Sequence, residues 1–241
     1  GRYFIPERRY HTAIKLNPTL LGPERLRDIL NTQLGYDVCV PDEAFGHDLK
    51  YNDGAAIIRN LAAAAETAGV AFGLKLTNTL ETANEKQNLP RSEGMVYMSG
   101  RSLHPISINL AERLQQEFDG KLDIAFSAGV DTFNVADTLA CGLRPITMSS
   151  DILKPGGYQR FTQIGDKLDA LDFKPFTGVD VVGIEALSLA ARSDKYHVKA
   201  IKPLPRRKLY EKVPLLDCFT APCKGGCPIH QDIPEYIELC R

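Results

Sequence analysis

Short apolar runs alternate with amphipathic stretches over residues 1 to about 175, and this rhythm constrains the fold more than any other feature of the chain. Such a pattern is expected of βα units, which build a parallel sheet with helices packed against it. We predict strands at 11–19, 36–40, 70–79, 121–129 and 143–150. A full (β/α)8 barrel has about 250 residues and eight strands. The predicted fold class is therefore α/β, with a partial (β/α)8 TIM-type barrel.

Helices are expected between these strands. Gly22 and Pro23 open the first one, because proline suits the first helical turn. Asp53 is predicted to cap a long helix that ends at Gly69, a natural stop. Further helices are expected, in chain order, at 107–118, 133–142 and 179–196.

The composition of the chain changes near residue 174, where prolines and scattered charged residues become frequent. We predict three parts. Residues 1–173 form the partial barrel, 174–214 form a helical linker, and 215–241 begin an α-helical iron–sulfur domain.

Composition excludes several classes of partner. Twenty-nine basic residues balance thirty acidic ones, which gives no electrostatic case for nucleic acid or an anionic membrane. No stretch approaches the roughly 20 apolar residues of a membrane span, and the first residues lack the apolar core of a signal peptide. A cytoplasmic protein is expected. Clustered cysteines in that reducing compartment favour metal ligation over disulfides.

Polar residues follow each predicted strand at its carboxyl end. In a barrel these ends line one mouth, so we expect the residues to converge on a pocket. The turn at Gly129 offers free backbone N–H groups, and the hydroxyls of Ser149 and Ser150 add donors for a phosphate. Lys15 and Lys75 would need an anion or an electron-rich ring. Either lysine could instead act as a Schiff-base nucleophile.

Cysteines cluster near residue 220, in the order Cys218-x4-Cys223-x3-Cys227-Pro228. Close spacing with a trailing proline is typical of iron–sulfur ligand runs. A structural zinc site is the alternative, although zinc sites usually contain paired CxxC units. Cys240 is interpreted as an ordinary helix cysteine, and Cys141 as inert packing. His104 is a candidate for acid/base work.

The order of several motifs resembles known families. These motifs are KLNPTLLG, FGLKLTNTL, YMSGRSLHPISIN, LRPITMSSDILKPGGY and QDIPEYI. Together they are similar to the C-terminal half of the flavin-binding barrel of dihydroorotate and dihydropyrimidine dehydrogenases. They resemble still more closely the YgfK family, whose members are described as selenate reductase subunits. Members of that family are much longer, so the resemblance implies that this chain is a fragment that starts inside the barrel and ends inside the cluster segment.

The dehydrogenase resemblance implies an FMN in the barrel. It places Lys15 at the N1/O2 edge of the flavin, where charge builds up on reduction. The other residues that it assigns to the flavin, its substrate side or its phosphate are Asn78, Thr79, Ser99, Gly100, Gly129, Ser149 and Ser150. The acid/base loop of those enzymes lies outside this chain, so the catalytic residues are unknown. Ala128 stands where those enzymes have glycine, and its Cβ is expected to intrude on the phosphate turn.

The cysteine segment is similar to the cluster domain of the glutamate synthase small subunit and of dihydropyrimidine dehydrogenase. That resemblance implies that Cys218 and Cys223 serve one [4Fe-4S] cluster and Cys227 another, both completed by residues outside this chain. An FAD is expected on a further C-terminal half.

The predicted function is electron relay between an FAD/NAD(P)H module and a partner subunit, of the molybdenum-enzyme type, in a multidomain iron–sulfur flavoprotein oxidoreductase. The fragment itself is expected to be inactive. The alternative is a non-catalytic scaffold with an empty barrel. The sequence does not identify the electron acceptor.

Overall fold

The computed structural model describes residues 1, 3–86, 89–154, 156–171, 178–199 and 228. The elements in these ranges lie within one compact unit of residues 1–200. The strands are β1 (Thr12–Leu16), β2 (Phe72–Leu76), β3 (Leu80–Ala83), β4 (Met95–Met98) and β5 (Ile124–Phe126). The helices are α1 (Pro23–Arg27), α2 (Asp42–Gly46), α3 (Tyr51–Ala68), α4 (Leu103–Glu117), α5 (Val135–Ala140), α6 (Arg160–Asp169) and α7 (Val181–Ala191).

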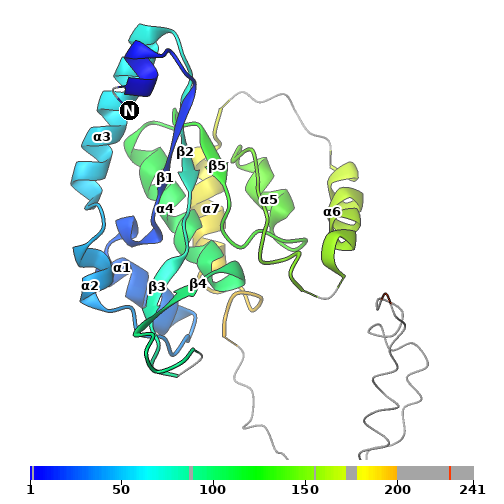
Figure 1. The fold of residues 1–241 in the computed structure, drawn as a ribbon. Coiled ribbons are helices and arrows are strands. Elements are labelled where there is room, and N and C mark those ends of the chain that lie inside the picture. The colour runs from blue at the N-terminus through cyan, green and yellow to red at the C-terminus, as the bar shows by residue number, and fades with distance from the viewer. Residues whose placement is uncertain (2, 87–88, 155, 172–177, 200–227, 229–241) are drawn as a thin grey trace, which may run out of the picture. The chain divides into compact units, whose positions relative to one another are not determined.

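A parallel sheet in the order β1-β2-β5 forms the centre of the unit (Figure 1). A further parallel bridge joins Phe126 to Ile146, so the segment near 146 lies beside β5. The predicted α/β class with a parallel sheet is confirmed. The strands in the described ranges do not close into a barrel.

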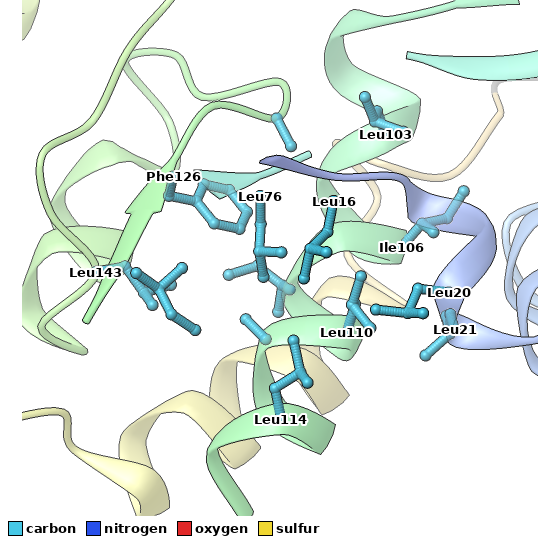
Figure 2. Close-up of a cluster of buried hydrophobic side chains, with 14 of the residues drawn as sticks. Leu16, Leu20, Leu21, Leu76, Leu103, Ile106, Leu110, Leu114, Phe126 and Leu143 are labelled. Carbon is cyan, nitrogen blue, oxygen red and sulfur yellow. The ribbon is translucent and has the colours of Figure 1, made fainter. Parts of the chain in front are cut away.

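One face of this sheet carries the hydrophobic core. Alternate strand residues such as Leu16, Leu76 and Phe126 point toward α4, where Ile106 and Leu110 meet them (Figure 2). All five are at most 6% exposed. A strand places successive side chains on opposite faces, so the other face carries a second set of residues. Its members are small or basic: Ala13, Lys15, Gly73, Lys75 and Ala125.

The predicted strand at 36–40 is wrong. These residues have no regular structure: side chains bind most of their carbonyl groups, and within the described residues only the Cys39 carbonyl accepts from a strand, at 2.9 Å from the Ala83 N–H of β3. The Asn31 amide donates to the carbonyls of Tyr36 and Val38, and the Arg27 guanidinium donates to that of Val40. This segment is therefore a fixed loop.

Strands β3 and β4 pair as an antiparallel hairpin in a region where no strand was predicted. Each strand has only four residues, and in β3 only Leu80 and Thr82 are buried. A strand of four residues is too short to show a clear alternation of apolar and polar residues, so the sequence does not predict it. The hairpin carries the chain to Ser99 and Gly100, which sequence analysis placed in a ligand site.

Some predicted helix boundaries agree with the structure and others do not. Gly69 ends α3 in the left-handed conformation with φ 65°, as predicted, and α1 begins at Pro23, as predicted. Asp53 is not a cap, because α3 already begins at Tyr51 and Asp53 lies in its first turn. Helix α4 begins at Leu103, four residues before the predicted start, since Pro105 is tolerated in a first turn.

Helix α7, within the stretch predicted as a linker, packs along α4 (Figure 1). The side chain of Asp180 caps α7 by accepting from the Gly183 N–H at 2.9 Å. On α4, the buried Asn109 amide donates to the Ser188 carbonyl of α7 at 3.2 Å. Its side-chain oxygen accepts a 2.7 Å hydrogen bond from Arg192. This buried polar network fixes α7 against α4.

Candidate functional site

A cavity of about 280 Å³ lies at the carboxyl ends of the parallel strands. It is formed by Lys15 near the end of β1, by the segments that follow β2, β4 and β5, and by the segment after Ile146. All eight residues that sequence analysis assigned to a flavin line it: Lys15, Asn78, Thr79, Ser99, Gly100, Gly129, Ser149 and Ser150. The chain thus brings them together from positions up to 135 residues apart, although their role in binding a flavin stays a prediction.

Two short contacts organise the walls of the cavity. The Lys15 ammonium donates to the Asn78 side-chain oxygen at 2.9 Å, which links the ends of β1 and β2. On another wall, the Ser150 hydroxyl donates to the Ser99 hydroxyl at 3.1 Å. The first contact holds an ammonium group at the cavity, and the second holds a pair of hydroxyls there.

Gly129 allows two segments to touch. It has φ +60°, and a Cβ placed on it would lie 2.1 Å from the Gly100 carbonyl oxygen. No side chain fits that space, so this position requires glycine for both its conformation and its close approach. Gly100 itself has φ +79°. The two glycines bring the turn after β5 against the segment after β4.

Ala128 does not have the expected effect. It is 1% exposed and belongs to the hydrophobic core, and it is not among the residues that line the cavity. Ser127, Gly129 and Val130 around it do line the cavity. The methyl group in place of a glycine hydrogen therefore points away from the proposed phosphate turn.

Two buried carboxylates that sequence analysis missed also line the cavity, and both are already bonded. Asp151 accepts hydrogen bonds from Lys154 at 2.9 Å and from Arg160 at 2.8 Å. Burial alone would raise the pKa of Asp151, but these two cations hold it below its ordinary value. Asp131 accepts from the Phe133 N–H at 2.9 Å and from the Tyr196 hydroxyl.

Arg101 is a further lining residue that sequence analysis missed. Its guanidinium carbon lies 5.2 Å from the centre of the Tyr196 ring, within cation–π range. The sequence could have indicated Arg101 as a lining residue, because it directly follows Ser99 and Gly100. The position of Tyr196 was not predictable, because that residue follows α7 and lies 95 residues further along the chain.

His104 is not placed for acid/base work at this cavity. It is fully buried and does not line the cavity. Its ring stacks on that of His197 with centroids 5.0 Å apart, and its Nε2 lies 3.3 Å from the Thr138 hydroxyl. Burial, with a smaller contribution from His197, lowers the pKa of His104 to about 3. It is therefore a neutral core residue at physiological pH.

The cavity donors fit a phosphorylated ligand. The lining of the cavity includes three hydroxyl residues, Ser99, Ser149 and Ser150, and the basic residues Lys15 and Arg101. Hydroxyl and cationic donors are the groups that bind phosphate oxygens in proteins. Taken together, the parallel sheet and this cavity define an α/β domain with a candidate ligand site at the carboxyl ends of its strands.

Comparison with known proteins identifies the family. Residues 1–199 match the family model described as "Oxidoreductase YgfK, N-terminal TIM-barrel domain". The proteins named "Putative oxidoreductase YgfK" from Escherichia coli K12 and from Escherichia coli O157:H7 are each 44% identical to this chain over 239 residues. That alignment covers 99% of this chain and 23% of each relative, so the chain spans about a quarter of their length. No solved structure matches.

The chain therefore belongs to the YgfK oxidoreductase family, in its N-terminal TIM-barrel domain. The predicted resemblance to the YgfK family is confirmed. The metal ligands predicted in the sequence, Cys218, Cys223 and Cys227, lie outside the described residues, as does Cys240. Within the described ranges no three His, Cys, Asp or Glu side chains are grouped as a metal site. None of the helices in those ranges is long and apolar enough to cross a bilayer.

Proposed function

We propose that this domain is the C-terminal half of a (β/α)8 barrel in a cytoplasmic, multidomain iron–sulfur flavoprotein oxidoreductase, and that its cavity binds FMN. The observation that carries the proposal is the convergence of all eight residues assigned to a flavin on one cavity. A ligand site at the carboxyl ends of parallel strands is the general rule for barrel enzymes. The oxidoreductase family supports redox chemistry as the type of reaction.

The residues present fit a flavin mononucleotide. The turn at Gly129 and the hydroxyls of Ser149 and Ser150 would hold its phosphate. The Lys15 ammonium, held by Asn78, would stabilise negative charge on the ring. When bound, a flavin supplies one- and two-electron transfer.

We further propose that Cys218, Cys223 and Cys227 bind [4Fe-4S] clusters, and that the protein relays electrons between an FAD/NAD(P)H module and a partner subunit of the molybdenum-enzyme type. The cysteine spacing and the proline after Cys227 support this assignment. Reduction of selenate, which the family description suggested, would then occur at the partner's metal centre.

The test is an iron, zinc, sulfide and flavin analysis of the full-length protein, purified without oxygen. We expect iron and acid-labile sulfide in about equal amounts, with a broad absorption band near 400 nm typical of such clusters. Cys227→Ser should lower the iron content, whereas Cys240→Ser is the matched control and should retain it. Zinc, or protein with neither metal nor colour, would contradict the relay.

The barrel is tested separately by releasing the flavin and measuring FMN apart from FAD. We expect FMN in wild-type protein and its loss in a Ser149→Ala/Ser150→Ala double variant, because both hydroxyls line the cavity. Clusters without FMN would leave the relay standing and identify the barrel as a scaffold. The Schiff-base alternative predicts a covalent adduct at Lys15 or Lys75 after borohydride treatment with a carbonyl substrate.

A further inference from the structure

We infer that Arg101 supplies the charge that binds a phosphomonoester in this cavity, and that Tyr196 is its positioning residue. The inference rests on the proposed ligand site and names its selectivity. The site should prefer a phosphorylated ligand over the same ligand without its phosphate. Neither residue was assigned from the sequence, and one of them lies outside the cavity lining.

Three basic residues line the cavity, and they differ in how their charges are already paired. They are Lys15, Arg101 and Lys154. Lys15 already donates to Asn78, and Lys154 already donates to the carboxylate of Asp151, both at 2.9 Å. Arg101 forms no ion pair with any carboxylate in the part of the chain that the structure describes. Its charge is thus available to a ligand, whereas the charge of Lys154 is already matched.

Tyr196 restrains Arg101 without neutralising it. The Tyr196 ring lies 5.2 Å from the Arg101 guanidinium carbon, and it also contacts the rings of Phe133 and His197, with centroids 4.5 and 5.4 Å away. The Tyr196 hydroxyl is bonded to the buried carboxylate of Asp131. These contacts restrain the orientation of the Tyr196 ring. A guanidinium that stacks on such a ring keeps its N–H donors free for other partners.

Asp131 is a buried carboxylate at the same lining, and it forms no ion pair with Arg101 in the part of the chain that the structure describes. One oxygen accepts from the Phe133 N–H at 2.9 Å and the other accepts from Tyr196. The Asn134 side chain fixes the same turn by accepting from the Asp131 N–H at 2.9 Å. Tyr196 therefore contacts both charged residues: its ring stacks on Arg101, and its hydroxyl donates to the carboxylate of Asp131.

The groups around Arg101 complete a phosphate-binding set. The hydroxyls of Ser99 and Ser150 are 3.1 Å apart, and both residues line the same cavity as Arg101. A planar guanidinium with several N–H donors matches the oxygens of a phosphate better than a single ammonium does. The chemical class of ligand is thus a phosphomonoester, with FMN as the probe that the proposed function names.

The experiment compares FMN, riboflavin and inorganic phosphate by calorimetric titration of the full-length protein. Arg101→Gln should weaken FMN binding at least tenfold and leave riboflavin binding within about twofold, since only FMN carries the phosphate. Arg8→Gln is the matched control. Arg8 also stacks on a tyrosine, at 5.0 Å from the Tyr3 ring, but it does not line the cavity. A flavin site elsewhere in the protein contributes equally to both variants.

Tyr196 is tested through the ratio of FMN affinity to riboflavin affinity, which a general loss of stability would not change. Tyr196→Leu removes the ring and should lower this ratio at least fivefold. Tyr196→Phe retains the ring and should keep most of the preference. An unchanged ratio in Tyr196→Leu would overturn the positioning role.

The outcomes separate this inference from the proposed function. Equal losses of FMN and riboflavin in Arg101→Gln, or no loss of either, would overturn the inference. If wild-type protein binds phosphate but no flavin, and Arg101→Gln abolishes that binding, the flavin proposal fails and the inference stands. If wild-type protein binds none of the three probes, both fail.

Discussion

The Lys15 ammonium donates a 2.9 Å hydrogen bond to the Asn78 side-chain oxygen, across the carboxyl ends of two neighbouring parallel strands. The backbone continues the same link, because the Asn78 N–H donates to the Leu16 carbonyl at 2.9 Å. Lys15 is paired in register with Lys75 of β2, but only Lys15 lines the cavity. This difference between two adjacent lysines gives the first prediction.

Lys15→Met should weaken flavin binding about tenfold and make the flavin harder to reduce, because it removes a positive charge that would favour the reduced ring. Lys75→Met is the control and should leave both properties within about twofold. Flavin titration and a redox titration of the full-length protein measure these effects. Equal effects of the two substitutions would contradict the assignment of Lys15.

Gly129→Ala should lower the free energy of unfolding by about 2 kcal/mol or more, since its Cβ meets a backbone oxygen and its φ is positive. Gly165→Ala is the control. Gly165 lies inside α6 with open space around the position of a Cβ, so alanine there should be neutral or stabilising by up to about 1 kcal/mol. Urea denaturation compares the two, and a Gly129 variant as stable as wild type would show that Gly129 and Gly100 are not in contact.

Acid should destabilise the domain through His104. Its folded-state pKa is about 3, below the value of about 6.5 expected in the unfolded chain, so the unfolded chain takes up the proton first. Stability is therefore complete above about pH 6.5 and is lost as the pH falls toward 3, with a slope of at most about 1.4 kcal/mol per pH unit. The second ring of the stack, His197, also has a pKa lowered by burial, so it adds to the same trend.

The check is denaturant unfolding at pH 7, 6 and 5, a range chosen because most carboxylates titrate lower. His104→Asn should reduce the loss of stability over this range. His47→Asn, at an exposed histidine, should not. An identical pH dependence in wild type and His104→Asn would exclude His104 as the cause.

Asn109→Ala should cost about 2 kcal/mol, because it removes the amide that joins α4 to α7. The substitution leaves the buried Ser188 carbonyl without that donor and removes the acceptor of Arg192. Glu185→Ala, on the exposed side of α7, should change stability by less than about 0.5 kcal/mol. Thermal or urea unfolding of both variants measures the difference, and a cost as small as that of the control would mean that α7 does not depend on this network.

Elements with local sequence signals are predictable from the sequence. The strand around 72–76 has a run of apolar residues, and the helix before Gly69 has helical spacing and a residue suited to the left-handed conformation. The strand predicted at 36–40 is wrong, because the side chains of Arg27 and Asn31 bind backbone carbonyls there that strand pairing would otherwise use. The β3–β4 hairpin has no such local signal, because its four-residue strands are defined by their pairing with each other.

The sequence alone determined the family, the parallel α/β architecture and the polar residues at the strand ends, because each depends on periodicity, side-chain chemistry or the order of motifs along the chain. Only the tertiary structure decided which charges remain available at the cavity. Asp131 is bonded to Tyr196, 65 residues away, and Asp151 to Arg160, while Arg101 rests on the Tyr196 ring. These two contacts of Tyr196 depend on where the segment after α7 returns to the sheet. That return is fixed by buried contacts between distant residues, which no local pattern encodes.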